Sequence, residues 1–135
     1  MVPLPALTGT RILVVDDQQD ERELLGAMFG RAGADVRMAG SAAEALSLLD
    51  EWSADVVVSD LAMPDQDGYT LIRELRSKQQ WQRLPAVAVT AHARPEDRQT
   101  ALAAGFDRYL SKPLDPHTLL ALVEGIVRRA ERDLR

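Results

Sequence analysis

Three aspartates stand directly after two short apolar runs of this sequence. Asp16 and Asp17 follow residues 11–15, and Asp60 follows residues 55–59. Carboxylates that lie close together raise one another's pKa and destabilise a fold unless a cation lies among them. Oxygen ligands without Cys or His nearby suit Mg²⁺, which binds one or two carboxylates and leaves positions open for water and phosphate oxygens. If folding brings the three aspartates together, they form a Mg²⁺ site.

Two further polar side chains, Thr90 and Lys112, each come after another apolar run. Transfer of a phosphoryl group to a carboxylate needs an attacking carboxylate, cations that neutralise the phosphoryl oxygens and a hydroxyl that binds the product. The three acids, the hydroxyl and the ammonium supply that set. Asp60 is the candidate nucleophile, because the other two aspartates are adjacent in one loop and are better placed to hold the metal together.

The elements that must position these side chains are short apolar runs that alternate with longer amphipathic segments. Within the longer segments, apolar residues recur at i, i+3, i+4 and i+7, which predicts helices with one buried face. The apolar runs are of strand length and predict buried strands. The expected strands are residues 11–15, 34–39, 55–59, 86–89 and 107–110.

The expected helices have recognisable ends. Ser41 followed by Glu44 forms a capping box at the start of one helix. Gly33 and Gly105 stand where helices should end in a left-handed residue. Three more helices are expected to start at Asp67–Gly68, at Pro95 and at Asp115–Pro116.

Strict alternation of strand and helix predicts right-handed crossovers and a parallel sheet that helices cover on both faces. The expected fold is therefore a doubly wound, flavodoxin-like α/β fold with five strands. Residues 35–38 alternate in polarity as a half-exposed edge strand should, which favours the strand order 2-1-3-4-5. In such sheets ligands bind beyond the carboxyl ends of strands 1 and 3, where the acids are expected to lie.

Length and composition limit the classes of protein to consider. The chain has 135 residues, 46% of them hydrophobic and none of them cysteine, so we expect one domain without disulfides, in the cytoplasm. A net charge of −5 disfavours nucleic acid as a partner, and no apolar stretch is long enough to predict membrane insertion. We expect a linker over residues 1–9, the folded domain over 10–131 and a charged tail over 132–135.

Taken together, the motifs resemble those of the response-regulator receiver family, whose members are CheY-like. The resemblance covers residues 10 to about 129, and the motifs are specific in combination. They are Val14-Val15-Asp16-Asp17, Ser59-Asp60-Leu61-Ala62-Met63-Pro64 with Asp67-Gly68, Val89-Thr90-Ala91 and Tyr109-Leu110-Ser111-Lys112-Pro113.

The resemblance implies a role for each residue of the site. Asp60 would accept the phosphoryl group, and Thr90 and Lys112 would contact it. Asp17 and Asp60 would bind Mg²⁺ directly, together with the backbone carbonyl of Ala62, while Asp16 would act through metal-bound water. The sequence departs from many family members at Ala62, where they carry a polar side chain. The lifetime of the phosphorylated state is therefore left open, and His92 near the rim of the site bears on the same question.

The resemblance also implies a switch and its partners. Thr90 would move toward the phosphoryl group, Tyr109 would turn inward, and the face made by the fourth helix, fifth strand and fifth helix would change; a cis bond before Pro113 would aim the lysine. The phosphoryl donor would be a histidine kinase or a phosphotransfer domain, and the changed face would bind a downstream protein, with a homodimer as a further option. The style of the motifs is similar to receivers of hybrid sensor histidine kinases, so the parent protein is expected to be such a kinase.

Other functions share parts of this pattern. A Mg²⁺-dependent aspartyl-phosphate hydrolase would carry Asp-x-Asp after the first strand and an insertion to cover its substrate, and neither is present here. A docking module without phosphorylation would have lost one acid, the threonine or the lysine. An FMN carrier needs a phosphate-binding loop where this chain has Asp17-Gln18-Gln19-Asp20. We therefore expect a phosphorylation switch that is no enzyme beyond its own phosphorylation and dephosphorylation.

Overall fold

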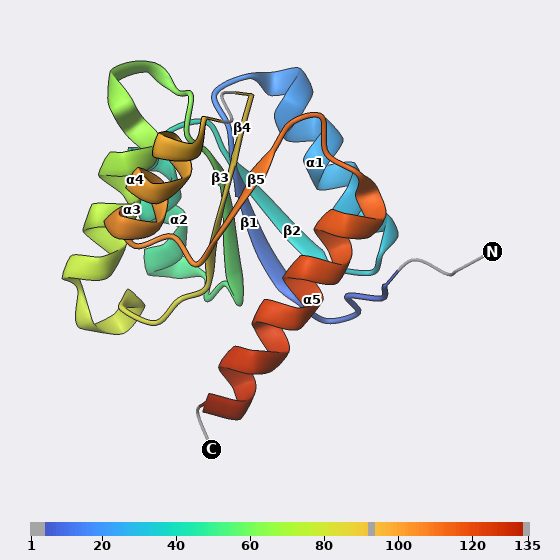
Figure 1. Ribbon diagram of the computed structural model, residues 1–135. Helices are drawn as coiled ribbons and strands as arrows, with labels where there is room; N and C mark the ends of the chain where they lie inside the picture. The colour runs from blue at the N-terminus through green and yellow to red at the C-terminus, as the bar shows by residue number, and fades with distance from the viewer. Residues whose placement is uncertain (1–4, 92–93, 134–135) are drawn as a thin grey trace.

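The computed structural model describes residues 5–91 and 94–133, and within them five strands alternate with five α-helices (Figure 1). Two short 3₁₀ helices flank the third α-helix. In chain order the elements are β1 (Arg11–Val15), α1 (Gln19–Arg31), β2 (Asp35–Ala39), α2 (Ala42–Glu51), β3 (Val56–Asp60), η1 (Pro64–Gln66), α3 (Asp67–Ser77), η2 (Gln79–Trp81), β4 (Ala86–Thr90), α4 (Pro95–Ala104), β5 (Arg108–Ser111) and α5 (Pro116–Asp133).

The strands form one parallel sheet in the order β2-β1-β3-β4-β5, as predicted. Strands β3 and β4 are buried along their whole length, and β1 is buried except at its first residue. Strand β2 is an edge strand and stays largely open to solvent, which accounts for its alternating sequence. Strand β1 has the expected ends, and the other four strands differ from the expected ranges by one residue at one or both ends. Asp60 and Thr90 are the last residues of their strands.

The sheet separates two apolar layers, because successive side chains of a strand point to opposite faces. Val57 and Ala88 belong to the layer covered by α2, α3 and α4, while Val58 and Val89 belong to the layer covered by α1 and α5. Figure 1 shows the two groups of helices on opposite sides of the sheet. Phe29 of α1 is fully buried and is among the largest side chains of the second layer.

The predicted helix ends are confirmed. Ser41 accepts a hydrogen bond from the Glu44 backbone N–H at 3.1 Å, and the Glu44 carboxylate accepts one from the Gly40 N–H at 3.3 Å. Gly33 and Gly105 have φ angles of 94° and 126°, a region that glycine enters without steric cost.

Both domain boundaries differ from the expected ones. Leu7 is only 2% exposed, packs in the layer under α1 and α5, and donates its backbone N–H to the Ala32 carbonyl at 2.8 Å. The packed part of the chain therefore includes Leu7, which lies before the expected start at residue 10. At the other end α5 continues to Asp133, beyond the expected end at residue 131. Residues 1–4 and 134–135, also assigned to linker and tail, lie outside the described part of the chain.

No helix in residues 5–91 and 94–133 combines the length and the apolar character that a membrane span requires.

The start of α3 lies against the end of β3. A Cβ atom on Gly68 would stand 2.6 Å from the Asp60 carbonyl oxygen and 3.0 Å from the Leu61 Cα, both of them backbone atoms. The preceding residue, Asp67, accepts a hydrogen bond from the Ala42 N–H at 2.5 Å and so caps α2. The Asp-Gly pair thus holds α2, α3 and the loop after Asp60 together.

We expect Gly68→Ala to lower the free energy of unfolding by about 1–3 kcal/mol, because the added methyl group meets backbone that cannot give way without strain. Urea denaturation followed by circular dichroism measures the change. Gly125→Ala in α5 is the matched control. A Cβ there meets nothing within 4 Å, so the variant should gain about 0.5–1 kcal/mol. Equal stability of the two variants would contradict the close approach at Gly68.

Candidate functional site

The site lies at the carboxyl edge of the sheet, where β1, β3 and β4 end beside one another. Asp16 follows β1 directly, and its backbone N–H donates to the Ala39 carbonyl at 3.1 Å, which continues the pairing with β2. Asp60 ends β3 opposite Val89. The parallel ladder therefore brings together residues that are 44 positions apart in the sequence, as predicted.

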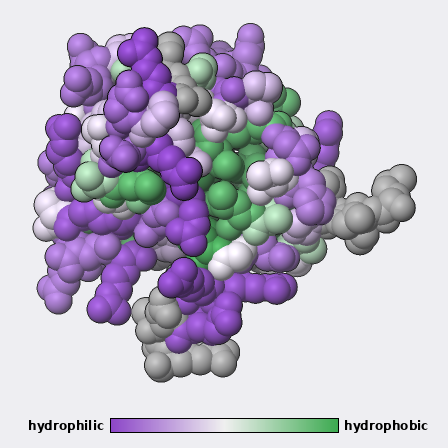
Figure 2. Space-filling model, viewed as in Figure 1, coloured by the Kyte–Doolittle hydropathy of each residue, from purple (hydrophilic) through white to green (hydrophobic). Residues whose placement is uncertain are grey.

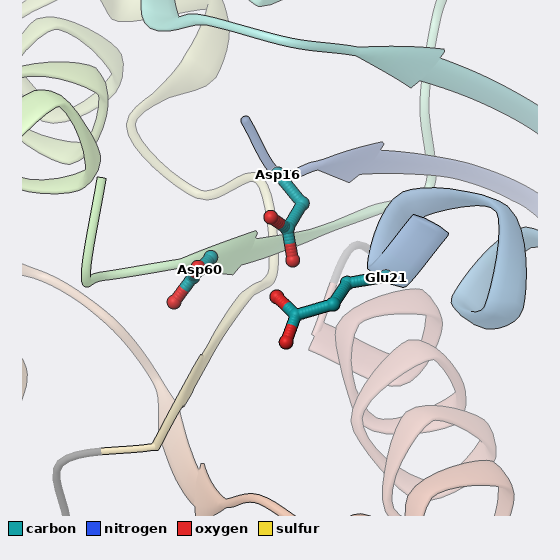
Figure 3. Close-up of side chains that lie close together, drawn as sticks. All are labelled: Asp16, Glu21 and Asp60. Atoms are coloured by element: carbon teal, nitrogen blue, oxygen red, sulfur yellow. The ribbon is translucent and has the colours of Figure 1, made fainter. Parts of the chain in front are cut away.

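Lys112 lies at the centre of this group. Its Nζ atom is 2.7 Å from Glu21 Oε2, 3.3 Å from Asp16 Oδ2 and 3.6 Å from Asp60 Oδ2. Figure 3 shows the side chains of Asp16, Glu21 and Asp60 lying close together, by the ends of β1 and β3 and the start of α1. The Lys112 ammonium thus forms ion pairs with all three carboxylates. The backbone N–H of Lys112 donates to the Thr90 carbonyl at 2.8 Å, which ties its position to β4.

The two aspartates of this cluster are buried. Asp16 is 0% and Asp60 is 3% exposed. Burial raises the pKa of Asp16, and the charge of Asp60 acts in the same direction. A hydrogen bond from the Gln18 N–H and the charge of Lys112 oppose the rise without cancelling it. Ionising Asp16 in the folded protein therefore costs more free energy than ionising it in water.

In the two partly exposed groups of the cluster, Glu21 and Lys112, the pKa shifts favour the charged form. The hydrogen bond from Lys112 lowers the pKa of Glu21, whose side chain is 46% exposed. Burial by itself lowers the pKa of Lys112, but the hydrogen bond to Glu21 and the charges of Asp60, Asp16 and Glu21 outweigh burial and raise it. Lys112 is therefore firmly protonated.

Glu21 is the member of the cluster that sequence analysis missed. The three carboxylates that the structure brings within 4.8 Å of one another are those of Asp16, Glu21 and Asp60, whereas Asp17 was the expected third member. Glu21 is the third residue of α1, so the first turn of the helix carries it over the acidic loop. An acid a few residues after the Asp-Asp pair, at the beginning of the amphipathic segment that follows it, was the signal that could have found it.

Asp17 has an oxygen in need of a ligand. Its Oδ1 atom is buried and has no hydrogen-bond partner among the residues that the structure describes, while Oδ2 accepts a long hydrogen bond of 3.5 Å from Gln18. A buried carboxylate oxygen without a partner is costly. This oxygen, together with the oxygen-only donors of Asp16 and Asp60, fits a hard divalent cation such as Mg²⁺.

The remaining predicted residues lie in the loop after Asp60, at the end of β4, in β5 and just beyond β5. The Ala62 N–H donates to Asp60 Oδ1 at 3.0 Å, and Thr90 is buried at the end of β4. Tyr109 is half-buried in β5, and burial raises the pKa of its hydroxyl, with Asp97 contributing. The peptide bond before Pro113 is cis, as expected. His92 lies outside the described residues.

A pocket of about 310 Å³ opens next to these residues. It connects the loop after Asp60 with the end of β4 and the start of α4. Its walls are Leu61, Ala62, Tyr69, Thr90, Arg94 and Asp97. Ala62 contributes only a methyl group to these walls.

A five-stranded parallel sheet in this order, with acids, a threonine and a lysine at its carboxyl edge, defines a phosphorylation-type signalling module. Residues 12–124 match the response regulator receiver domain family, and the chain belongs to this family. The general function of the family is to accept a phosphoryl group in two-component signalling.

Known relatives place the domain in proteins of different size. The chain is 51% identical to a 14.6 kDa protein from Leptolyngbya boryana over 90% of its own length and 92% of that protein. It is 41% identical to the sensor histidine kinase RcsC of Salmonella typhi, again over 90% of this chain but only 12% of RcsC. Among solved structures, the chemotaxis response regulator CheY4 of Vibrio cholerae is 30% identical, with a TM-score of 0.81 over 88% of this chain and 99% of CheY4.

We expect Asp16→Asn to raise the free energy of unfolding by about 1 kcal/mol at neutral pH without divalent cations. The Asn side chain resembles the uncharged carboxyl, which burial favours at this position. Lys112 retains its contacts with Glu21 and Asp60 in the variant. Because the folded-state pKa of Asp16 is raised above its ordinary value of 3.8, wild type loses stability as the pH rises above that value. The gain should therefore shrink as the pH is lowered toward 3.8.

Urea titrations over a pH series measure this difference. Asp20→Asn removes an exposed acid from the first turn of α1 and should change stability by less than about 0.5 kcal/mol. A loss of stability in Asp16→Asn at neutral pH would show that the ion pair with Lys112 outweighs the cost of burial.

Proposed function

We propose that this chain is a Mg²⁺-dependent phosphorylation switch of a two-component phosphorelay, with Asp60 as the phosphoacceptor. The observation that supports this most directly is the position of Asp60. Its carboxylate ends a central strand, is buried, accepts a hydrogen bond from Ala62 and lies 3.6 Å from the Lys112 ammonium.

In the proposed reaction an oxygen of Asp60 attacks the phosphorus of a phosphohistidine on the donor protein. A P–O bond forms as the P–N bond breaks, and the electron pair stays with the imidazole nitrogen. Lys112 neutralises negative charge on a phosphoryl oxygen, and the Thr90 hydroxyl hydrogen-bonds another. The chain catalyses only its own phosphorylation and dephosphorylation.

Mg²⁺ would be held by Asp16, Asp17 and Asp60 together with the backbone carbonyl of Ala62. The Asp17 oxygen that has no hydrogen-bond partner in the described part of the chain, and the proximity of Asp16 to Asp60, support this set. When bound, the ion supplies positive charge that stabilises the oxygens of the transferring phosphoryl group. Glu21 would add a fourth negative charge beside the three aspartates without being needed as a ligand.

The proposed signal leaves through α4, β5 and α5. Thr90, Tyr109 and Pro113 form the switch, in which Thr90 moves toward the phosphoryl group and Tyr109 turns inward. The pocket lined by Thr90 and Tyr69 supports this, because it offers space beside Thr90, next to Arg94 and Asp97 at the start of α4. In Figure 2 an apolar strip separates the hydrophilic surfaces of α4 and α5, where Figure 1 places β5. A partner protein would dock on this face.

We also propose the setting in which the switch works. The phosphoryl donor is a histidine kinase or a phosphotransfer domain in the cytoplasm, and the receiver occupies residues 10–131 together with the packed segment around Leu7. The likeness to the RcsC kinase favours a hybrid sensor histidine kinase as the parent protein, whereas the 14.6 kDa relative represents a small protein of the same length. A homodimer through the α4, β5 and α5 face is a further option.

We expect acetyl phosphate with Mg²⁺ to add one phosphoryl group to the wild-type protein and none to Asp60→Asn, because the amide is no nucleophile at phosphorus. Intact mass spectrometry measures the addition. Asp65→Asn is the control: Asp65 is exposed, lies five residues further on and has a φ of 59°, which Asn tolerates. This variant should be phosphorylated like wild type. Phosphorylation of Asp60→Asn to the wild-type extent would place the acceptor elsewhere.

We expect Thr90→Ala to bind beryllofluoride, an analogue of the phosphoryl group, and yet to lose most of the response at Tyr109. The hydroxyl supplies part of the differential affinity that moves the switch, a coupling of about 1–3 kcal/mol. Fluorotyrosine ¹⁹F NMR measures the response, with Tyr109→Phe to assign the signal. Thr100→Ala removes an exposed hydroxyl that bonds the Glu96 carbonyl and should respond like wild type. A full response in Thr90→Ala would remove Thr90 from the switch.

A further inference from the structure

The hydrogen bonds of Lys112 are distributed unevenly among its three carboxylate neighbours. The shortest contact, 2.7 Å, goes to Glu21, while Asp16 lies at 3.3 Å and the phosphoacceptor Asp60 at 3.6 Å. The lysine side chain is 16% exposed, so few water molecules compete for its donors. The closest partner of the ammonium is therefore Glu21, which has no role in the proposed reaction.

Glu21 also lies close to the position where a phosphoryl group would form. Its carboxylate oxygen is within 4.8 Å of those of Asp16 and Asp60. Glu21 stands on the first turn of α1, whereas Lys112 follows β5, so their contact links two elements that meet at the carboxyl edge of the sheet. A phosphoryl group on Asp60 would face both the negative charge of Glu21 and an ammonium already engaged with it.

We propose that Glu21 is a positioning residue that competes with the phosphoryl group for Lys112, and so weakens phosphoryl binding while it strengthens binding of the divalent cation. This inference rests on the proposed function and adds to it a residue that tunes the balance between the two ligands. Glu21 acts through Lys112 and through its charge, and it needs no bond to either ligand.

The two effects have opposite signs for a physical reason. An ammonium has three N–H donors, and a donor given to Glu21 is withheld from a phosphoryl oxygen. The negative charge of Glu21 repels the phosphoryl group but attracts a cation. Without Glu21, the ammonium would also turn more fully to Asp16 and Asp60, where it competes with the cation for the same oxygens. Removing the charge should thus tighten one ligand and loosen the other.

A purely structural role for Glu21 predicts something different. An acid in the first turn of a helix stabilises that helix through the partial positive charge of its N-terminus. Loss of that effect would lower the free energy of unfolding, but it would not change the two affinities in opposite directions.

The test compares wild type, Glu21→Gln and Glu23→Gln. Glu23→Gln removes the same charge from the same helix, but Glu23 is exposed and contacts Gln19 rather than Lys112. Isothermal titration calorimetry gives the Kd of Mg²⁺ alone and then the Kd of beryllofluoride at saturating Mg²⁺. The ¹⁵N NMR signal of the Lys112 ammonium reports its hydrogen bonding directly, and urea denaturation checks that each variant is folded.

For Glu21→Gln we expect a Mg²⁺ Kd higher by about twofold to fivefold and a beryllofluoride Kd lower by a similar factor, the range set by a partly exposed ion pair. The Lys112 signal should shift in Glu21→Gln alone, and Glu23→Gln should match wild type. Affinities of Glu21→Gln that equal those of wild type, or that change in the same direction, overturn the role of Glu21 and leave the proposed function standing. A wild-type protein that binds neither ligand overturns both.

Discussion

The fold depends on one constraint at its carboxyl edge, where buried carboxylates are held close together against their mutual repulsion. Lys112 relieves this repulsion by lying within 3.6 Å of Asp16, Glu21 and Asp60, and burial nevertheless keeps the pKa of Asp16 raised. Repulsion among these carboxylates lowers the stability of the unliganded protein. A bound cation would reduce this repulsion, so its binding would be favoured. The sheet, with its buried central strands, supplies the rigidity that holds the charges in place.

The layered architecture could be predicted from the sequence because each local signal agreed with the global one. Continuous apolar strands, amphipathic helices and the caps at Ser41, Gly33 and Gly105 all favour the same sheet order, and the structure has it. The boundaries were less predictable. Leu7 follows two prolines, which favoured a linker, yet it is buried in the apolar layer under α1 and α5, which no local pattern reveals.

The site was predictable to the extent that strand ends determine it. Asp16, Asp60 and Lys112 come together because parallel strands end at one edge, and residue type then indicates the chemistry. Glu21 could not be placed in the same way, because it reaches the cluster by the rotation of a helix rather than by the end of a strand. The unpartnered oxygen of Asp17 is likewise a property of packing, since its burial depends on how the loop turns into α1.

The hydrogen bond between Asp67 and the start of α2 gives the segment after Asp60 two fixed ends. One end is Asp60, the last residue of β3. The other is Asp67, whose carboxylate accepts from the Ala42 N–H and is followed by Gly68, which lies against the backbone of Asp60 and Leu61. Residues 61–66 thus form a short bridge whose span cannot lengthen without breaking a helix cap. These contacts tie β3, α2 and α3 together on one side of Asp60, so the switch that we propose would act on the other side, where β4 leads into α4.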